Sequence, residues 1–155
     1  MKKLVLTLTL AVCFTAFINA QDYNTGIGLR GGIYYGLTIK HFISSKAAIE
    51  GLLTRKYGFD ITALYEVHNR AFDVNKLNWY YGLGGHIGFW DGADLVDKTA
   101  GTSYTIIGID GILGLEYNFS EAPINISIDW KPAFNIIGYS AFWPDGGALS
   151  IRYIF

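Results

Sequence analysis

The feature of this sequence that most restricts its fold is a run in which apolar and polar residues strictly alternate. From Ile124 to Lys131 every second residue is isoleucine or tryptophan, and the residues between them are polar or charged. Successive side chains of a β-strand point to opposite faces, so this period of two predicts a strand with one apolar and one polar face. In a helix the same residues would be scattered around the whole circumference.

The same period recurs along most of the chain and predicts a protein made of strands. Residues typical of turns, such as glycine, proline, serine and asparagine, separate the alternating runs. Two strands are predicted at residues 24–33 and 35–42, joined at Gly31-Gly32 or just beyond. Six more are predicted, at Ile49 to Thr54, Phe59 to Val67, Trp79 to Phe89, Ile107 to Phe119, Ile124 to Lys131 and Leu149 to Phe155. We therefore expect eight antiparallel strands, each followed in space by the next along the chain.

Composition indicates which face of these strands is turned outward. The chain is 51% hydrophobic and contains 11 Tyr, 10 Phe and 4 Trp. The interior of an eight-stranded barrel is too narrow for that mass of aromatic side chains. A closed barrel pairs all of its backbone groups, so its apolar outer face can instead meet acyl chains. The predicted fold is an all-β, eight-stranded antiparallel up-and-down transmembrane β-barrel with a polar, side-chain-filled interior.

The polar face of the strands then supplies the contents of the barrel. Its charged residues and one histidine are Arg30, Lys40, Glu50, Asp60, Glu66, His86, Asp110, Glu116, Asp129, Lys131 and Arg152. Unpaired charges in so narrow a space are costly, so we expect these groups to form an interlocked network of salt bridges. Two of the carboxylates could alternatively act as an acid–base pair, but no substrate could reach them in a packed interior.

Catalytic, cofactor and metal sites are not expected. His86 is predicted to be a hydrogen-bonded interior residue, and the other histidines, His41 and His68, are predicted near chain turns. Three aspartates between residues 91 and 97 could suggest calcium, but their spacing does not match that of an EF-hand loop. We read that segment as a solvated loop.

Aromatic residues gather near strand ends, where a membrane barrel carries its interfacial girdles. The predicted girdle residues are Trp79, Tyr81, Phe89, Trp90, Trp130, Trp143 and Tyr153. The interval from Trp79 to Phe89, at about 3.3 Å per residue and a tilt of about 40°, projects to roughly 25 Å along the membrane normal. That height matches the apolar band of outer-membrane barrels.

Residues 1–20 are predicted to be a cleavable signal peptide. Two lysines precede an apolar stretch from Leu4 to Phe17, which is shorter than the roughly twenty residues of a spanning helix. Cleavage after Ala20 would leave residues 21–155 as a single barrel domain and would remove Cys13, the only cysteine. The formal charge would change from -1 to -3, since two of 12 basic residues are lost against 13 acidic ones. No basic run is present, so nucleic acid is not an expected partner.

The C-terminal run from Leu149 to Phe155 resembles the assembly signal of bacterial outer-membrane barrels. Ile151, Tyr153 and Phe155 occupy its alternate apolar or aromatic positions. With the signal peptide and the strand count, residues 21–155 resemble the small eight-stranded barrels of the OmpX and OmpA transmembrane-domain type. The resemblance implies a monomer in the bacterial outer membrane that contacts outer-membrane lipids and lipopolysaccharide and is inserted by the barrel-assembly machinery.

The resemblance also implies an orientation and a class of function. Both termini would face the periplasm, with periplasmic turns at Asn69 to Lys76 and at Ser120 to Pro123. The segments Asp91 to Thr102 and Asn135 to Gly146 would be external loops that serve a non-enzymatic structural or adhesion-like role. A lipid A-modifying enzyme is one alternative, although no His-x-Ser arrangement occurs in the chain. A soluble lipocalin-like carrier is the other, and it would need an apolar cavity where charged residues are predicted.

Overall fold

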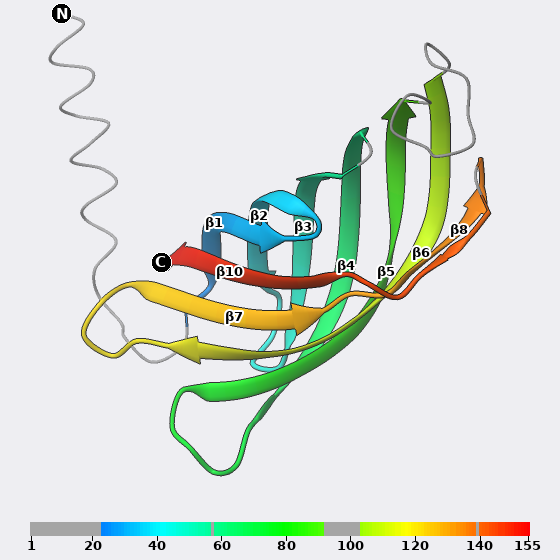
Figure 1. The fold of residues 1–155 in the computed structure, drawn as a ribbon. Coiled ribbons are helices and arrows are strands. Elements are labelled where there is room, and N and C mark those ends of the chain that lie inside the picture. The colour runs from blue at the N-terminus through cyan, green and yellow to red at the C-terminus, as the bar shows by residue number, and fades with distance from the viewer. Residues whose placement is uncertain (1–22, 57, 92–102, 139) are drawn as a thin grey trace, which may run out of the picture.

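The computed structural model describes residues 23–56, 58–91, 103–138 and 140–155, and these residues form strands joined by turns (Figure 1). The predicted signal peptide, its cleavage site and residues 92–102 of one predicted external loop lie outside the described residues. The strands are β1 (Thr25–Gly32), β2 (Tyr35–Phe42), β3 (Ala47–Arg55), β4 (Gly58–Arg70), β5 (Leu77–Asp91), β6 (Ser103–Asn118), β7 (Ile124–Trp130), β8 (Ala133–Ile137), β9 (Phe142–Trp143) and β10 (Gly147–Ile154).

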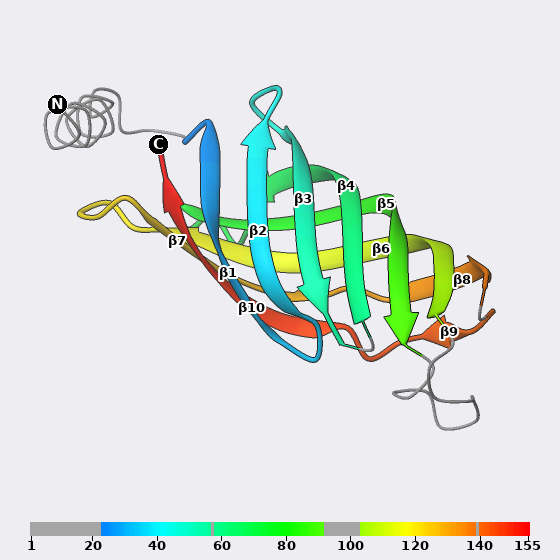
Figure 2. The ribbon, with the colours of Figure 1, turned by 90° about the horizontal axis from the view of Figure 1, so that it is seen from above.

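These ten segments form a closed barrel of eight strands, because two of the barrel strands are interrupted. β7 and β8 both pair with β6 and so form one interrupted strand. β10 pairs with β7, and β9 pairs with β8, so β9 and β10 form the other. The pairings β5–β6 and β1–β10 close the sheet, and every pairing is antiparallel. Figure 2 shows β1 to β5 side by side along one wall, with β6, β7 and β10 on the other side. The predicted all-β, eight-stranded antiparallel barrel is therefore confirmed.

The interruption between β7 and β8 falls at Lys131 and Pro132. Proline has no backbone N–H and cannot donate to a ladder, so a break at this position is expected. The Pro132 carbonyl still accepts a hydrogen bond from the Gly111 N–H at 2.9 Å, and the Lys131 N–H donates to the Gly146 carbonyl at 3.0 Å. The two segments thus continue as one wall of the barrel.

The strand register places the apolar parity on the outside, as predicted. Leu115, Ile128 and Leu149 form a row across three neighbouring strands and are 38%, 60% and 50% exposed. The adjacent residues on the same three strands, Glu116, Ser127 and Ser150, form a second row, and this row is buried. In a barrel closed on itself, this alternation separates an apolar outer surface from a polar interior.

The predicted bounds of the first two strands agree closely with the structure, β3 and β4 extend up to three residues beyond theirs, and the second half of the chain needs correction. β1 and β2 lie within one residue of their predicted bounds. The predicted external loop from Asn135 to Gly146 is wrong for much of its length, because β8 extends to Ile137 and β9 lies within the same span. The reason is that Asn135 continues the inward parity while Phe134 and Ile136 continue the outward one.

The barrel has two dissimilar ends, which we name the termini end and the far end. The first and last strands begin and finish at the termini end, where the turns at residues 43–46, 71–76 and 119–123 also lie. The wall made by β5 and β6, of 15 and 16 residues, reaches further at the far end than β1 and β2, of 8 residues each (Figure 1). The far end is therefore taller on one side.

Candidate functional site: the polar interior and its two ends

The inward parity of the strands brings the predicted interior residues together. All of them are at most 5% exposed: Arg30, Lys40, Glu50, Asp60, Glu66, His86, Asp110, Glu116, Asp129, Lys131 and Arg152. Their side chains come from strands on every side of the barrel. Asp60 accepts a hydrogen bond from Trp90, and the other ten residues meet in three groups along the barrel axis. Each group pairs cations with carboxylates, which is what burial of charge requires.

The group nearest the termini end is built around Lys40. Its ammonium lies 2.7 Å from Glu66 Oε2, 3.5 Å from Glu50 Oε2 and 3.7 Å from Glu116 Oε2. Arg152 forms a salt bridge with Glu50 and also donates to Thr38 Oγ1 at 2.9 Å. Four strands, β2, β3, β4 and β6, together with β10, are thereby cross-linked through one cluster.

The middle group is a paired guanidinium and carboxylate. Arg30 donates from two nitrogens to the two oxygens of Asp129, at 2.7 and 2.5 Å. Such a two-point contact is the strongest geometry available to these groups. The Tyr80 hydroxyl also donates to Asp129 at 3.2 Å, and the Lys40 ammonium lies 3.9 Å from the centre of the Tyr80 ring. Tyr80 therefore connects this group to the first one.

The third group lies toward the far end and contains His86. Its Nδ1 is 2.7 Å from Asp110 Oδ2, and its Nε2 is 2.9 Å from Asn135 Oδ1. Lys131 forms a salt bridge with the same Asp110 carboxylate. Both ring nitrogens are engaged, so His86 is a hydrogen-bonded interior residue and has no nitrogen turned toward a substrate.

Sequence reasoning missed His68, which it placed near a chain turn. The side chain is 4% exposed, with Nε2 at 3.1 Å from Glu66 Oε2 and Nδ1 at 3.2 Å from Glu116 Oε1. Its ring stacks on Tyr80 with 4.9 Å between ring centres. The signal was present, since His68 shares the inward parity of Glu66. His41, in contrast, is exposed near the end of β2.

The two buried histidines complete the charge count of the interior. Among the described residues, the buried basic and acidic side chains are four Lys or Arg residues, six Asp or Glu residues, and these two histidines, each of which contacts a carboxylate. With both imidazoles protonated, six positive groups face six negative ones. Without the histidines, four cations would face six carboxylates.

The predicted aromatic girdle is only partly on the outer surface. Trp79, Tyr81, Phe89, Trp130 and Tyr153 are between 39% and 55% exposed. The assignments of Trp90 and Trp143 are wrong, because both side chains belong to the interior. Trp90 is 2% exposed and donates to Asp60 Oδ1 at 2.8 Å, and Trp143 packs against it. Adjacent residues of a strand face opposite sides, so Phe89 and Trp90 could not both point outward.

These two tryptophans help to cap the far end of the interior. The Trp90 and Trp143 rings meet edge to face at 5.8 Å. The Lys56 ammonium lies 4.9 Å from the ring centres of both Trp143 and Tyr34 and forms a 2.7 Å salt bridge with Asp145. We call Tyr34, Lys56, Trp90, Trp143 and Asp145 the far-end cap.

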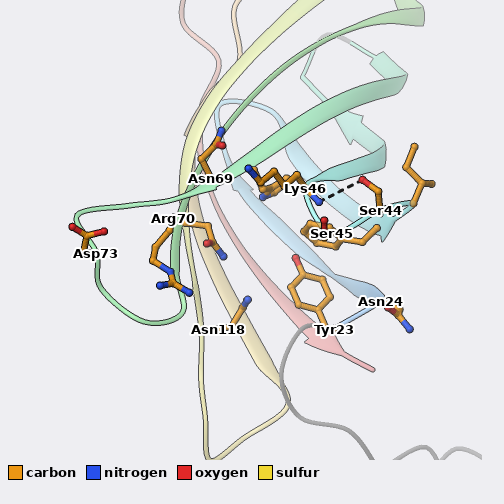
Figure 3. Close-up of a pocket in the computed structure, with 13 residues that line it drawn as sticks. Tyr23, Asn24, Ser44, Ser45, Lys46, Asn69, Arg70, Asp73 and Asn118 are labelled. Carbon is orange, nitrogen blue, oxygen red and sulfur yellow. Dashed lines mark hydrogen bonds between the residues drawn. The ribbon is translucent and has the colours of Figure 1, made fainter.

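The termini end, in contrast, is hollow. A cavity of about 680 Å³ opens there (Figure 3), and we call it the termini cup. It is lined by Tyr23, Asn24, Phe42, Ile43, Ser44, Ser45, Lys46, His68, Asn69, Arg70, Asp73, Asn78 and Asn118. Burial, followed by the neighbouring Glu116 carboxylate, raises the pKa of Tyr23 well above its ordinary value, and the hydroxyl donates to Glu116 Oε2 at 3.2 Å. The cup thus adjoins the charged group around Lys40, to which Glu116 belongs.

Two of the predicted assembly-signal residues lie on the outer face of β10, and the third, Phe155, directly follows this strand. Ile151, Tyr153 and Phe155 are 51%, 46% and 50% exposed, and β10 pairs with β1 on one side and β7 on the other. The strand that carries them is therefore the one that closes the barrel.

Within the described ranges, no three His, Cys, Asp or Glu side chains are grouped so as to hold a metal ion. Over the same residues, no helix is long and apolar enough to cross a membrane, a finding that does not bear on crossing by strands. Comparison with protein-family models, with curated proteins and with solved structures gives no match to this chain.

Proposed function

We propose that this chain is a non-enzymatic integral protein of the bacterial outer membrane, with a barrel that anchors it and a surface that meets other molecules outside the cell. The observation that carries the proposal is the sorting of side chains by face. Large apolar residues such as Leu29 and Leu83, 67% and 75% exposed, cover the outside, while the paired charges fill the inside. An apolar surface of this extent is unfavourable in water and favourable against acyl chains.

The same sorting supports this function over the two alternatives. A lipocalin-like carrier needs an apolar cavity inside the barrel, and the described interior holds salt bridges at that place. A lipid A-modifying enzyme needs a reactive group at the lipid-facing surface, whereas His86 has both nitrogens bound to Asp110 and Asn135 inside. The termini would face the periplasm, and the wall of β5 and β6 would project outward.

Cell fractionation tests the membrane location. We expect the protein in the outer-membrane fraction, released by detergent, with faster gel migration when unboiled because the folded barrel stays compact. Recovery in the soluble periplasm without detergent would overturn the proposal in favour of a carrier. Mass spectrometry of lipid A from cells with and without the protein should give identical acylation patterns, and a changed pattern would favour the enzyme.

A lysine placed on the outer face tests the lipid contact directly. Ile128 is 60% exposed on β7 and has outward neighbours on both adjoining strands. Ile128→Lys should destabilise the barrel in lipid vesicles by about 2 to 4 kcal/mol if the residue lies near the bilayer midplane. Glu121→Lys, in the exposed turn at the termini end, is the control and should have little effect. Equal unfolding curves for the two variants would contradict the lipid-facing assignment.

The surface role has a separate test. Residues 92–102 connect β5 and β6, so replacing them with a short Gly-Ser linker should leave folding and heat-dependent migration intact. Adhesion or another surface phenotype should change. If cells with the shortened protein behave like those with the full chain, the surface role is lost and an architectural role alone remains.

A further inference from the structure

The termini cup is a hollow part of the interior that the described residues enclose. At the far end, the far-end cap lies over the third charged group, with Trp90 against Asp60 and Lys56 between two rings. At the termini end, the cup of about 680 Å³ opens outward from the first charged group. Cavities that hold small molecules have volumes of roughly 300 to 1,000 Å³. The cup is therefore large enough for a ligand of several hydrogen-bonding groups.

The lining of the cup is basic and rich in amides. Lys46 and Arg70 contribute side chains that form no ion pair with the residues the structure describes. Figure 3 shows Arg70 on the same side of the cup as Asn118, while Asp73, the acidic residue of the lining, stands apart on the outer part of the β4–β5 turn. The positive charge of the cup is thus not neutralised by its own acidic group.

The floor of the cup does not offset this charge. Beneath it, Glu66 and Glu116 are each in contact with Lys40 and with His68, so their negative charge is already satisfied. The walls add the amide groups of Asn24, Asn69, Asn78 and Asn118, which can both donate and accept hydrogen bonds. A ligand matched to these groups has a negative charge and neighbouring amide or hydroxyl groups.

We propose that the termini cup binds a small carboxylate-bearing molecule, with Lys46 and Arg70 contacting its carboxylate and the asparagines contacting its amide or hydroxyl groups. A peptide carboxylate and a sugar acid both have this chemistry. The assignment of the cup to the periplasmic side rests on the proposed function, but binding itself does not. The proposed outer-membrane location and the proposed carboxylate binding can therefore be disproved independently of each other.

Nuclear magnetic resonance titration of the full chain folded in detergent micelles tests the proposal. The probes are N-acetylglycylglycine with its C-terminal amide as the uncharged counterpart, and glucuronate with glucose as the uncharged counterpart. We expect at least one carboxylate to shift the resonances of Tyr23 and Asn118 saturably, and its uncharged counterpart to bind more weakly. Which carboxylate binds identifies the source of the ligand. Absence of a saturable shift with both carboxylates, or equal binding of charged and uncharged forms, would overturn the proposal.

Matched variants locate the binding. Lys46→Gln and Arg70→Gln change exposed side chains, so both should fold, as unboiled gel migration will verify. Each should weaken carboxylate binding about threefold to fivefold. Arg55→Gln removes another exposed cation, on β3 at the far end, and should leave the dissociation constant unchanged. Equal weakening by Arg55→Gln would show that the carboxylate follows the overall charge of the protein, and would exclude the cup as the site.

Discussion

Arg30 and Asp129 show what a single pair contributes inside this barrel. Both side chains are fully buried, and they meet through two short contacts. Taking two charges out of water is costly, so the pair adds little net stability compared with two apolar residues of similar size. Losing one partner is different, because the remaining charge stays buried without compensation.

Asp129→Ala should therefore lower the free energy of unfolding by about 3 to 5 kcal/mol, since it leaves the Arg30 guanidinium unpaired. The double variant Arg30→Met with Asp129→Leu removes both charges and should recover most of that loss. Urea titrations of the folded barrel in lipid vesicles, followed by unboiled gel migration, measure both values. A double variant that is no more stable than Asp129→Ala would contradict this account of the pair.

His68 gives a second prediction at the residue scale. Its imidazole contacts Glu66 and Glu116 and stacks on Tyr80. His68→Phe keeps an aromatic ring in place but removes both polar contacts, so we expect a loss of about 3 kcal/mol in the same unfolding assay. His41→Phe, at an exposed position where the ring hydrogen-bonds with Thr25 Oγ1, should change stability by at most about 1 kcal/mol. Equal values for the two histidines would exclude His68 from the interior charge balance.

Individual residues also mark where reading the sequence succeeded and where it did not. Alternation alone places Arg152 and Glu116 inside, because parity is a property of the strand. Two predictions do not follow this parity. Trp90 is predicted to face outward because it is aromatic, and His68 is predicted to lie near a turn. In both cases the parity of the strand was the better guide, since a strand cannot turn two adjacent side chains to one face.

At the scale of the strand, glycines on the inward parity make room for the large interior rings. A Cβ atom on Gly114 would lie 2.5 Å from Tyr80 Cζ and 2.8 Å from Asp129 Cβ. β6 therefore approaches the middle charged group more closely than a strand with an alanine there could. The sequence displays the glycines, but it does not reveal which ring each of them accommodates.

Gly114→Ala should destabilise the barrel by about 1 to 3 kcal/mol, because Tyr80 and Asp129 would have to move out of contact. Gly31→Ala is the control, since a Cβ there would meet nothing nearer than the Leu149 carbonyl at 3.9 Å. The comparison uses urea unfolding of both variants in the same vesicles. If Gly31→Ala costs as much as Gly114→Ala, the loss comes from strand propensity and not from crowding at Tyr80.

The continuation of β7 into β8 could not be predicted from the sequence pattern. Alternation ends at Lys131, and the segment from Asn135 to Gly146 is predicted to be an external loop. The structure continues the wall through β8, since Lys131 and Pro132 bond to Gly146 and Gly111 across the break. These hydrogen bonds join residues that are far apart in the sequence. A pattern of neighbouring residues does not reveal them.

At the scale of the whole molecule, the three charged groups and the far-end cap follow one another along the barrel axis. The middle group, Arg30 with Asp129 and Tyr80, joins β1, β5 and β7 across the interior. The termini cup ends at the first group and does not continue past it. Eight strands enclose a space that side chains fill, so the interior acts as a plug with one hollow end.

The plug predicts that the barrel does not conduct ions. Reconstituted in a planar bilayer, the protein should give no steady conductance steps, and Trp90→Ala with Trp143→Ala should remain silent because the charged groups below the cap are untouched. A variant that also replaces Tyr80, Arg30 and Asp129 with alanine should stay silent as well, because the groups around Lys40 and His86 still fill the interior. Steady steps from the unmodified protein would show that the charged groups do not close the interior, and steps from the two-tryptophan variant would place the closure in the cap alone.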